Sequence, residues 1–131
     1  MVPHDDCKAL GILLVDDEPA FRTSLAEMLR DDGHAVHDYD EPASIPALDH
    51  LENVAILVTD YEMPGKNGFA LADDFHRHHP RVPVVLVTAY RTQSLDAQVL
   101  DRPFLRVVQK PVDYVVLHAL IHEACAASCD G

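Results

Sequence analysis

The sequence contains few cysteines and few aromatic residues, and each shortage argues against a class of protein. Its three cysteines, Cys7, Cys125 and Cys129, are odd in number and too few for a disulfide framework, which favours a reducing compartment. Four phenylalanines, four tyrosines and no tryptophan leave no aromatic platform on which single-stranded nucleic acid could stack.

Long apolar runs are also missing. No stretch approaches the ~18 consecutive apolar residues that a membrane-spanning helix needs. The early apolar run at residues 9–15 follows two aspartates and leads straight into Asp16, Asp17 and Glu18, which is unlike a signal peptide. We therefore expect a cytoplasmic protein without a membrane segment.

Basic residues are scarce. Ten lysines and arginines stand against 22 aspartates and glutamates, which gives a formal net charge of −12. A chain with this charge is repelled by phosphate backbones and by anionic lipid, so we expect no direct binding of nucleic acid or membrane. The remaining composition, 48% hydrophobic in 131 residues, is that of one folded globular domain.

Short apolar runs alternate along the chain with segments of helical periodicity. Continuous apolar runs are typical of parallel strands that are covered on both faces. The pattern predicts a doubly wound (βα)₅ domain, with a parallel five-stranded sheet in the flavodoxin-like order 2-1-3-4-5. The expected strands are residues 11–15, 35–39 (partly polar and nearer an edge), 54–59, 82–87 and 105–108. The expected helices begin at Pro19, Ser44, Phe69, Thr92 and just after Asp113, and the second of them spans residues 44–51.

This pattern leaves room for one domain. We expect a domain at residues 9–126, an N-terminal extension at residues 1–8 and a short tail at residues 127–131, with no output domain in this chain. The chain would be a stand-alone domain or one excised from a larger protein.

Polar residues follow four of the predicted strands. Asp16 and Asp17 follow the first, Asp60 the third, Thr88 ends the fourth and Lys110 follows the fifth. Ligands of open α/β sheets bind beyond the carboxyl ends of the strands, where the strand order reverses. The first and third strands are neighbours in the predicted order, so the three carboxylates should converge there.

Three carboxylates at close range raise each other's pKa, and a divalent cation would relieve the repulsion. Mg²⁺ is commonly held by one or two carboxylates together with phosphate oxygens and water. A further carboxylate could attack phosphorus and form an aspartyl phosphate, with Thr88 and Lys110 as donors to the phosphoryl oxygens. Any single acid could instead cap a helix or a turn, but five matched residues at strand ends favour a site.

Four short motifs also carry a resemblance to a known family. They are residues 13–19 (LLVDDEP), 58–65 (VTDYEMPG), 85–89 (VLVTA) and 110–111 (KP). In this order and spacing, and over residues 9–126, the chain resembles the receiver domain of two-component response regulators.

The resemblance implies a Mg²⁺-dependent phosphoacceptor. Asp60 would accept a phosphoryl group from a phosphohistidine on a sensor histidine kinase or a histidine phosphotransfer protein. Mg²⁺ would be held by Asp16, Asp17 and Asp60 and by the backbone carbonyl of Glu62. The domain would catalyse its own phosphorylation and dephosphorylation, and would be a signalling phosphoacceptor rather than an enzyme.

The resemblance also assigns the partners of the phosphoryl group and an output surface. Thr88 would hydrogen-bond the phosphoryl group, Lys110 would pair with it, and the bond from Lys110 to the structural Pro111 would be cis. Output, and a possible homodimer, would use the face formed by the fourth helix, the fifth strand and the last helix.

Some positions depart from the family pattern. Val107 stands where receivers usually carry the tyrosine or phenylalanine that swings inward on activation, so we expect altered signal output. Phe104 could replace that ring, although a packing role is the stronger interpretation. Ala89, Tyr90 and Glu62 occupy positions that tune the lifetime of the acyl phosphate, and the last two predict slow self-dephosphorylation.

Other interpretations remain. The chain could be a phosphorylation-independent interaction module that kept the acidic pocket. An aspartate-nucleophile phosphatase is disfavoured because such enzymes use an Asp-x-Asp motif, whereas Asp60 is followed by Tyr61 and Glu62, and because 131 residues leave no room for a cap domain. A flavodoxin is disfavoured because Asp16 and Asp17 would repel a phosphate.

Histidines form two clusters in the sequence. The cluster His76, His78 and His79 suits the carboxyl end of a helix dipole. A second set, His118, His122, Cys125 and Cys129, forms one helical stripe of metal-competent side chains. One straight helix rarely supplies four ligands to a tetrahedral ion, so core packing is the alternative.

Overall fold

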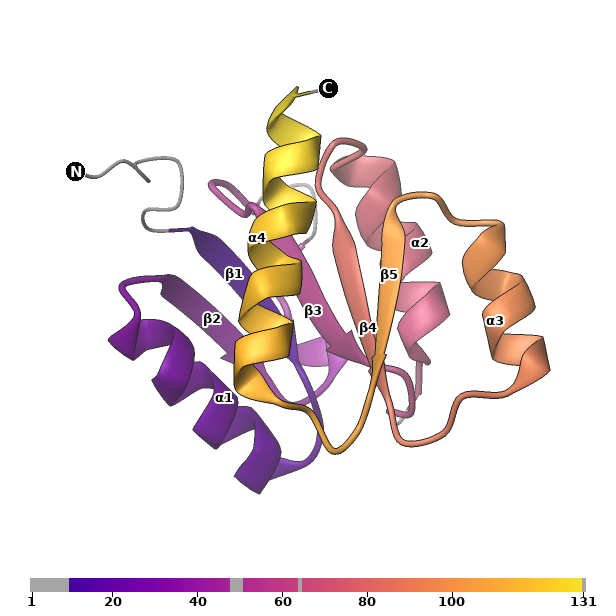
Figure 1. Cartoon of the computed structure of the whole chain (residues 1–131), viewed down its shortest axis with the longest axis horizontal. Helices are drawn as coiled ribbons and strands as arrows, with labels where there is room; N and C mark the ends of the chain where they lie inside the picture. The colour runs from indigo at the N-terminus through magenta and orange to yellow at the C-terminus, as the bar shows by residue number, and fades with distance from the viewer. Residues whose placement is uncertain (1–9, 48–50, 64, 131) are drawn as a thin grey trace.

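The computed structural model describes residues 10–47, 51–63 and 65–130, which form a parallel sheet between two layers of helices (Figure 1). The strands are β1 (Gly11–Val15), β2 (Ala35–Tyr39), β3 (Ile56–Asp60), β4 (Val84–Thr88) and β5 (Leu105–Gln109). The helices are α1 (Pro19–Asp31), α2 (Gly68–His78), α3 (Gln93–Leu100) and α4 (Tyr114–Asp130). All pairings are parallel, and the order β2-β1-β3-β4-β5 confirms the predicted topology.

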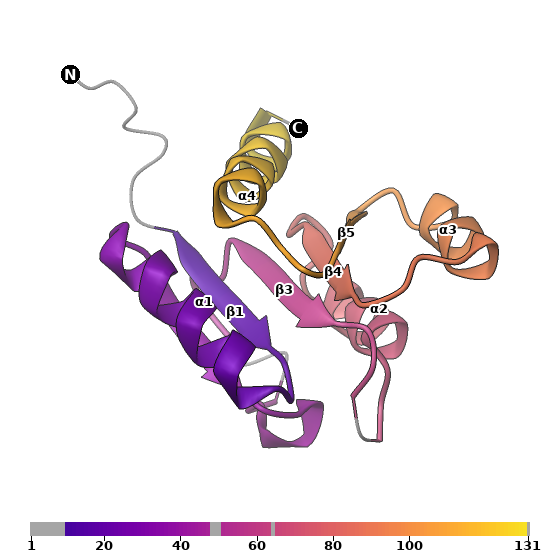
Figure 2. The ribbon, with the colours of Figure 1, turned by 60° about the horizontal axis from the view of Figure 1, so that its bottom comes forward.

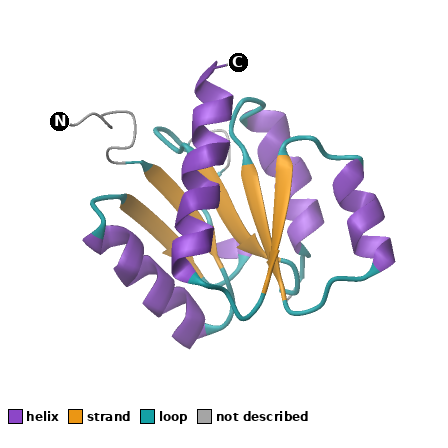
Figure 3. Ribbon diagram, viewed as in Figure 1, coloured by secondary structure: helices purple, strands orange, loops and turns teal. Residues whose placement is uncertain are grey.

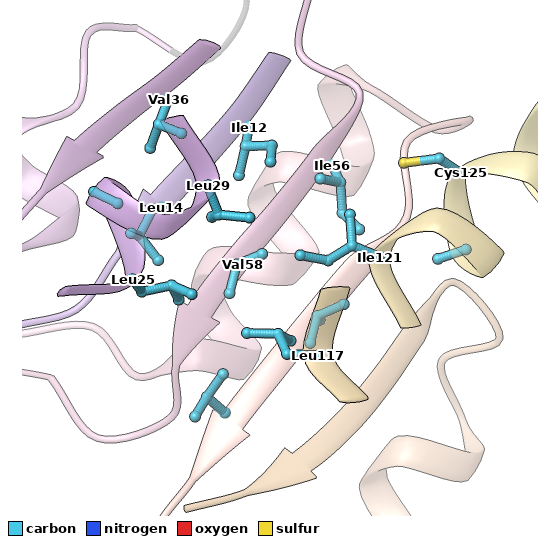
Figure 4. Close-up of a cluster of buried hydrophobic side chains, with 14 residues drawn as sticks. Ile12, Leu14, Leu25, Leu29, Val36, Ile56, Val58, Leu117, Ile121 and Cys125 are labelled. Carbon is cyan, nitrogen blue, oxygen red and sulfur yellow. The ribbon is translucent and has the colours of Figure 1, made fainter. Parts of the chain in front are cut away.

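Helices lie on both faces of the sheet (Figure 3), and the alternation of side chains along the strands divides the core between these faces. Ile12 and Leu14 of β1 point to the face covered by α1 and α4, while Leu13 and Val15 point to the face covered by α2. Figure 4 shows the first of these clusters, in which side chains of α1 and α4 meet over β1 and β3. Every residue of β3 and β4 is buried, as continuous apolar strands require, whereas β2 lies at an edge as expected.

The predicted helix at residues 44–51 is wrong in the described part of that range. Residues 45–47 and 51 are not helical, and residues 48–50 lie outside the described ranges. Among the described residues of this segment, the helical structure is a 3₁₀ turn at Pro42–Ser44, and Ile45 after it is extended at φ −76° and ψ 136°. Because Pro46 disfavours helical geometry at the residue before it, the turn cannot propagate into an α-helix.

Helix ends follow the expected chemistry. Thr92 accepts a hydrogen bond from the backbone N–H of Leu95 and caps α3, and Asp113 accepts from the N–H of Val115 before α4. Gly33 has φ +96° after α1, a left-handed conformation that glycine adopts at little cost. None of the helices described is both long and apolar enough to cross a membrane.

Candidate functional site

The carboxyl edge of the sheet gathers the site residues expected from the sequence. Figure 2 turns this edge toward the viewer and shows the loops that follow β1, β3 and β4. Asp16 and Asp17 follow β1, Asp60 is the last residue of β3, and Thr88 is the last residue of β4. Parallel strands end at one edge, so residues distant in sequence meet there.

Three carboxylates lie together at this edge. One oxygen from each of Asp16, Asp17 and Asp60 lies within 4.8 Å of the others. Asp17 is exposed, whereas Asp16 and Asp60 are 1% and 8% exposed. The backbone N–H of Glu18 donates to Asp16 Oδ1 at 2.8 Å, and the N–H of Tyr61 donates to Asp60 Oδ1 at 2.9 Å. These bonds fix both buried carboxylates and leave their Oδ2 atoms for other contacts.

Lys110 brings a cation to the carboxylates. Its Nζ lies 3.3 Å from Asp16 Oδ2 and 3.9 Å from Asp60 Oδ2, and it donates to Glu18 Oε1 at 3.2 Å. The ammonium also lies 4.5 Å from the centre of the Phe21 ring, a cation–π distance. The backbone N–H of Lys110 donates to the Thr88 carbonyl at 2.8 Å, and the Lys110–Pro111 bond is cis.

The charges in this pocket do not balance. Burial, and then the charge of Asp16, raise the pKa of Asp60 to about 6, although Lys110 opposes the shift. Burial likewise raises the pKa of Asp16. Burial lowers the pKa of Lys110, but the two carboxylates outweigh it and the net pKa is raised, so the ammonium stays charged. Carboxylates therefore remain in excess over the single ammonium.

The donor set fits a hard divalent cation. Asp16 Oδ2 is buried and, within the described part of the chain, receives no hydrogen bond; Lys110 Nζ approaches it only as an ion pair. A buried carboxylate oxygen in that condition is costly unless a cation coordinates it. Oxygen ligands from one or two carboxylates are what Mg²⁺ uses in proteins.

Thr88 is engaged elsewhere in this conformation. Its hydroxyl donates to the Tyr90 carbonyl at 3.0 Å and accepts from the Tyr90 N–H at 3.3 Å. Tyr90 is 73% exposed, and Glu62 lies with Tyr90 and Thr88 around a surface hollow of about 390 Å³. Ala89 is exposed next to Thr88, and its carbonyl accepts from Gln109 Nε2 at 3.2 Å. Glu62 and Tyr90 therefore border a hollow beside Thr88, at the end of β4.

The remaining predicted positions pack rather than line the acidic pocket. Val107 is half-buried on the face covered by α2. The Phe104 ring stacks on His76 at 3.9 Å between centroids and an interplanar angle of 8°, and contacts the same core. This contact favours the interpretation of Phe104 as a packing residue.

Sequence reasoning missed the contributions that α1 and its N-cap residue Glu18 make to the site. Arg22 donates to the backbone carbonyl of Asp16 at 2.8 Å and pairs with Asp38 at 3.2 Å, which fixes the turn after β1. Glu18 and Phe21 both contact Lys110. Sequence spacing could have indicated these contacts. Glu18, Phe21 and Arg22 are three and four residues apart at the start of α1, so they share one side of the helix.

Comparison with known proteins identifies the family. Residues 12–122 match the family model described as "Response regulator receiver domain". The chain belongs to this family. The receiver domain is 30% identical over 119 residues to the "Response regulator protein FleR" of Pseudomonas aeruginosa, covering 86% of this chain and 25% of FleR.

Other relatives extend the comparison. An "Uncharacterized 14.6 kDa protein in sodA1 3'region" of Leptolyngbya boryana is 32% identical over 121 residues, covering 90% of the receiver domain and 92% of that protein. A CheY-like receiver domain structure from Methanospirillum hungatei JF-1 has a TM-score of 0.85 at 23% identity, covering 94% and 98% of the two chains, which shows the shared fold. The receiver domain spans about a quarter of the length of FleR and of the Salmonella typhimurium regulator PgtA.

Proposed function

We propose that this receiver domain accepts a phosphoryl group on Asp60 from a phosphohistidine donor, in a Mg²⁺-dependent reaction, and then changes conformation to control a partner protein or an output domain. The main support for this proposal is the cluster of Asp16, Asp17 and Asp60, whose carboxylate oxygens lie within 4.8 Å of one another, with the Lys110 ammonium beside them. The alternative of a phosphorylation-independent module is disfavoured because that use would not need this costly set of buried charges.

Asp60 is suited to act as the nucleophile. Its Oδ1 accepts from the Tyr61 N–H, so Oδ2 is the oxygen that attacks phosphorus. With a pKa of about 6, the carboxyl group is mostly ionised at neutral pH. The new Oδ2–P bond replaces the P–N bond of the donor, and the electron pair of that bond leaves with the imidazole, which takes a proton.

Neighbouring groups would hold the transferred phosphoryl group. Asp16, Asp17 and Asp60, with the backbone carbonyl of Glu62, would hold Mg²⁺, which supplies charge neutralisation at the phosphoryl oxygens. Lys110 Nζ, 3.9 Å from Asp60 Oδ2, would donate to one phosphoryl oxygen. Thr88 would donate to another after its hydroxyl leaves the Tyr90 carbonyl.

Signal output would differ from the usual aromatic switch. Val107 has no ring to rotate, and Phe104 is held against His76. A sensor histidine kinase or histidine phosphotransfer protein would be the donor, in the cytoplasm. Output, and a possible homodimer, would use the face formed by α3, β5 and α4; Val115 and Val116 of α4 are exposed.

Mass spectrometry after incubation with a small phosphodonor tests the proposal. With Mg²⁺ and acetyl phosphate we expect one added phosphoryl group, in the peptide that contains Asp60, and no addition when EDTA replaces Mg²⁺. An adduct of equal extent in EDTA, or one that maps to a different residue, contradicts the proposed function.

The lifetime of the acyl phosphate tests the tuning residues. We expect a lifetime of minutes or longer, because the Glu62 carboxylate and the Tyr90 ring border the hollow beside Thr88 and hinder an attacking water. Glu62→Asn should shorten it several-fold, measured as decay of the phosphorylated mass after removal of the donor. Glu52→Asn, an exposed acid away from this hollow, should leave the lifetime unchanged, and equal lifetimes for all three proteins would refute the assignment.

A further inference from the structure

Three imidazoles from distant parts of the chain come together away from the acidic pocket. His34 precedes β2, and His118 and His122 lie one turn apart on α4. His34 Nε2 is 3.0 Å from His118 Nε2, and His122 Nε2 is 3.2 Å from the same atom. His34 lies at the amino end of a strand, whereas Asp60 lies at a carboxyl end, so the two sites occupy opposite ends of the parallel sheet.

The separations match those between ligands of a tetrahedral metal ion. Zn²⁺–N bonds of about 2.0–2.1 Å place neighbouring ligand atoms about 3.3 Å apart in a tetrahedron. The His118 Nε2 atom lies 3.0 Å and 3.2 Å from the other two imidazole nitrogens, and Asp32 Oδ2 is 3.8 Å from it. The three imidazoles each offer a nitrogen within 4.8 Å of the other two, and they therefore lie close to the spacing that one such ion requires.

The structure corrects the ligand set suggested by the helical stripe. Cys125 Sγ points to the Ala55 carbonyl at 3.6 Å and belongs to the core, and the side chain of Cys129 lies outside the described part of the chain. Asp32 and His34, on either side of Gly33 in the turn between α1 and β2, replace them as partners of the α4 histidines. The turn between α1 and β2 therefore supplies candidate metal ligands that α4 alone cannot.

Surrounding groups orient this cluster. The Tyr114 hydroxyl donates to Asp32 Oδ2 at 2.6 Å and so holds this carboxylate beside His118, as outer-shell groups do at metal sites. The Tyr114 ring also stacks on His118 at 5.4 Å between centroids. Burial, and then the charge of His118, lower the pKa of His34 and of His122, which favours the neutral imidazole that metals bind.

We propose that His34, His118 and His122 bind one divalent transition-metal ion such as Zn²⁺, with the Asp32 carboxylate beside His118, and that the ion thereby links α4 to the turn between α1 and β2. Imidazole ligands select Zn²⁺, Cu²⁺ or Ni²⁺, whereas Mg²⁺ and Ca²⁺ prefer oxygen ligands. The two candidate metal sites of this protein therefore differ in ligand chemistry as well as in position.

Metal binding has a specific consequence at Leu10. The Leu10 backbone N–H donates to His34 Nδ1 at 3.1 Å, so in the metal-free protein the proton of neutral His34 sits on Nε2 and is donated toward His118. Coordination through Nε2 moves that proton to Nδ1, and the Leu10 amide loses its acceptor. We therefore expect micromolar rather than nanomolar affinity, and a shift of the Leu10 amide resonance when metal binds.

Calorimetric titration of the whole chain with Zn²⁺ tests the site. Excess Mg²⁺ is present throughout, and Asp60→Asn is titrated in parallel to remove a ligand of the acidic pocket. We expect one equivalent of Zn²⁺ to bind in both proteins, and His118→Asn or His122→Asn to weaken binding by at least about tenfold. His37→Asn, an exposed histidine on β2, is the matched control and should bind as the unaltered chain does.

Thermal unfolding of His122→Asn separates loss of the metal site from misfolding. Because His122 is half-buried, this variant should unfold at the same temperature as the metal-free unaltered chain. Unlike the unaltered chain, its unfolding temperature should not rise when Zn²⁺ is added. Zn²⁺ binding that survives both α4 substitutions, or no binding at micromolar Zn²⁺, overturns the proposal. An unmoved Leu10 amide resonance on saturation overturns the role of His34. The test is independent of phosphorylation, so it does not depend on the proposed function.

Discussion

Asp60→Asn is expected to abolish the phosphoryl adduct and, in the same protein, to raise the free energy of unfolding at pH 7 by on the order of 2–3 kcal/mol in EDTA. The loss of the adduct follows because an amide oxygen is not a nucleophile toward phosphorus. The gain in stability follows because the pKa of the buried Asp60 is raised from 3.8 to about 6, so its ionised form opposes folding. Asparagine still offers an oxygen to the Tyr61 N–H.

The sign of this stability effect gives it a pH dependence. A carboxyl group with a raised pKa in the folded state stabilises the protein most below its unfolded pKa of 3.8, and that contribution is lost as pH rises through about 6. The difference between Asp60→Asn and the unaltered chain should therefore be largest near pH 7 and should fall below about 1 kcal/mol at pH 4.

Urea unfolding at these two pH values, with EDTA throughout, measures the effect. Glu27→Gln removes one exposed acid from α1 and should show neither the gain at pH 7 nor its loss on acidification. A variant at Asp60 that unfolds like Glu27→Gln would mean that the pocket does not oppose ionisation.

Gly68→Ala is expected to lower the free energy of unfolding by about 3 kcal/mol and to reduce phosphorylation of Asp60. A Cβ at Gly68 would lie 2.6 Å from the Asp60 carbonyl oxygen and 2.9 Å from the Tyr61 Cα. Both are backbone atoms of the segment that holds the acceptor, and the Gly68 N–H also donates to the Tyr61 carbonyl at 2.8 Å. Relief of the clash must displace that segment, which outweighs the gain of about 1 kcal/mol in helix propensity.

Gly65→Ala is the matched control in the same loop. Gly65 has φ +84° and a Cβ added there would meet no atom within 4 Å, so alanine incurs only the backbone strain of about 1–2 kcal/mol. Urea unfolding and the rate of phosphorylation by acetyl phosphate are compared for both variants. Equal losses of stability, or full phosphorylation of Gly68→Ala, would show that the close approach at Gly68 does not govern the acceptor.

Much of the fold was predictable because local pattern and topology agree. The continuous apolar runs of β1, β3 and β4 require cover on both faces, and parallel strands then place their polar successors at one edge. Asp16, Asp60 and Thr88 could be brought together on this basis alone. The helix predicted at residues 44–51 failed because the apolar spacing was weighed above the conformational restriction that Pro46 places on Ile45.

Side-chain contacts between elements that are not paired in the sheet could not be predicted from the sequence. The meeting of His34 with His118 depends on how α4 packs against the end of α1, which sequence periodicity does not specify. The contact of Glu18 with Lys110 depends on side-chain conformations at 92 residues of separation. In both cases the residue types were visible in the sequence, but their partners came from tertiary packing.

The hydroxyl of Thr88 has one proton to give, and in this conformation the carbonyl of Tyr90 receives it. The same proton cannot be donated to a phosphoryl oxygen at the same time. A hydrogen bond from Thr88 to a phosphoryl group on Asp60 therefore requires loss of the hydrogen bond that holds the Tyr90 carbonyl in the loop after β4. The Tyr90 amide N–H donates to the same hydroxyl. Hydrogen exchange of this amide should therefore be slower in the unmodified protein and faster in the phosphorylated one.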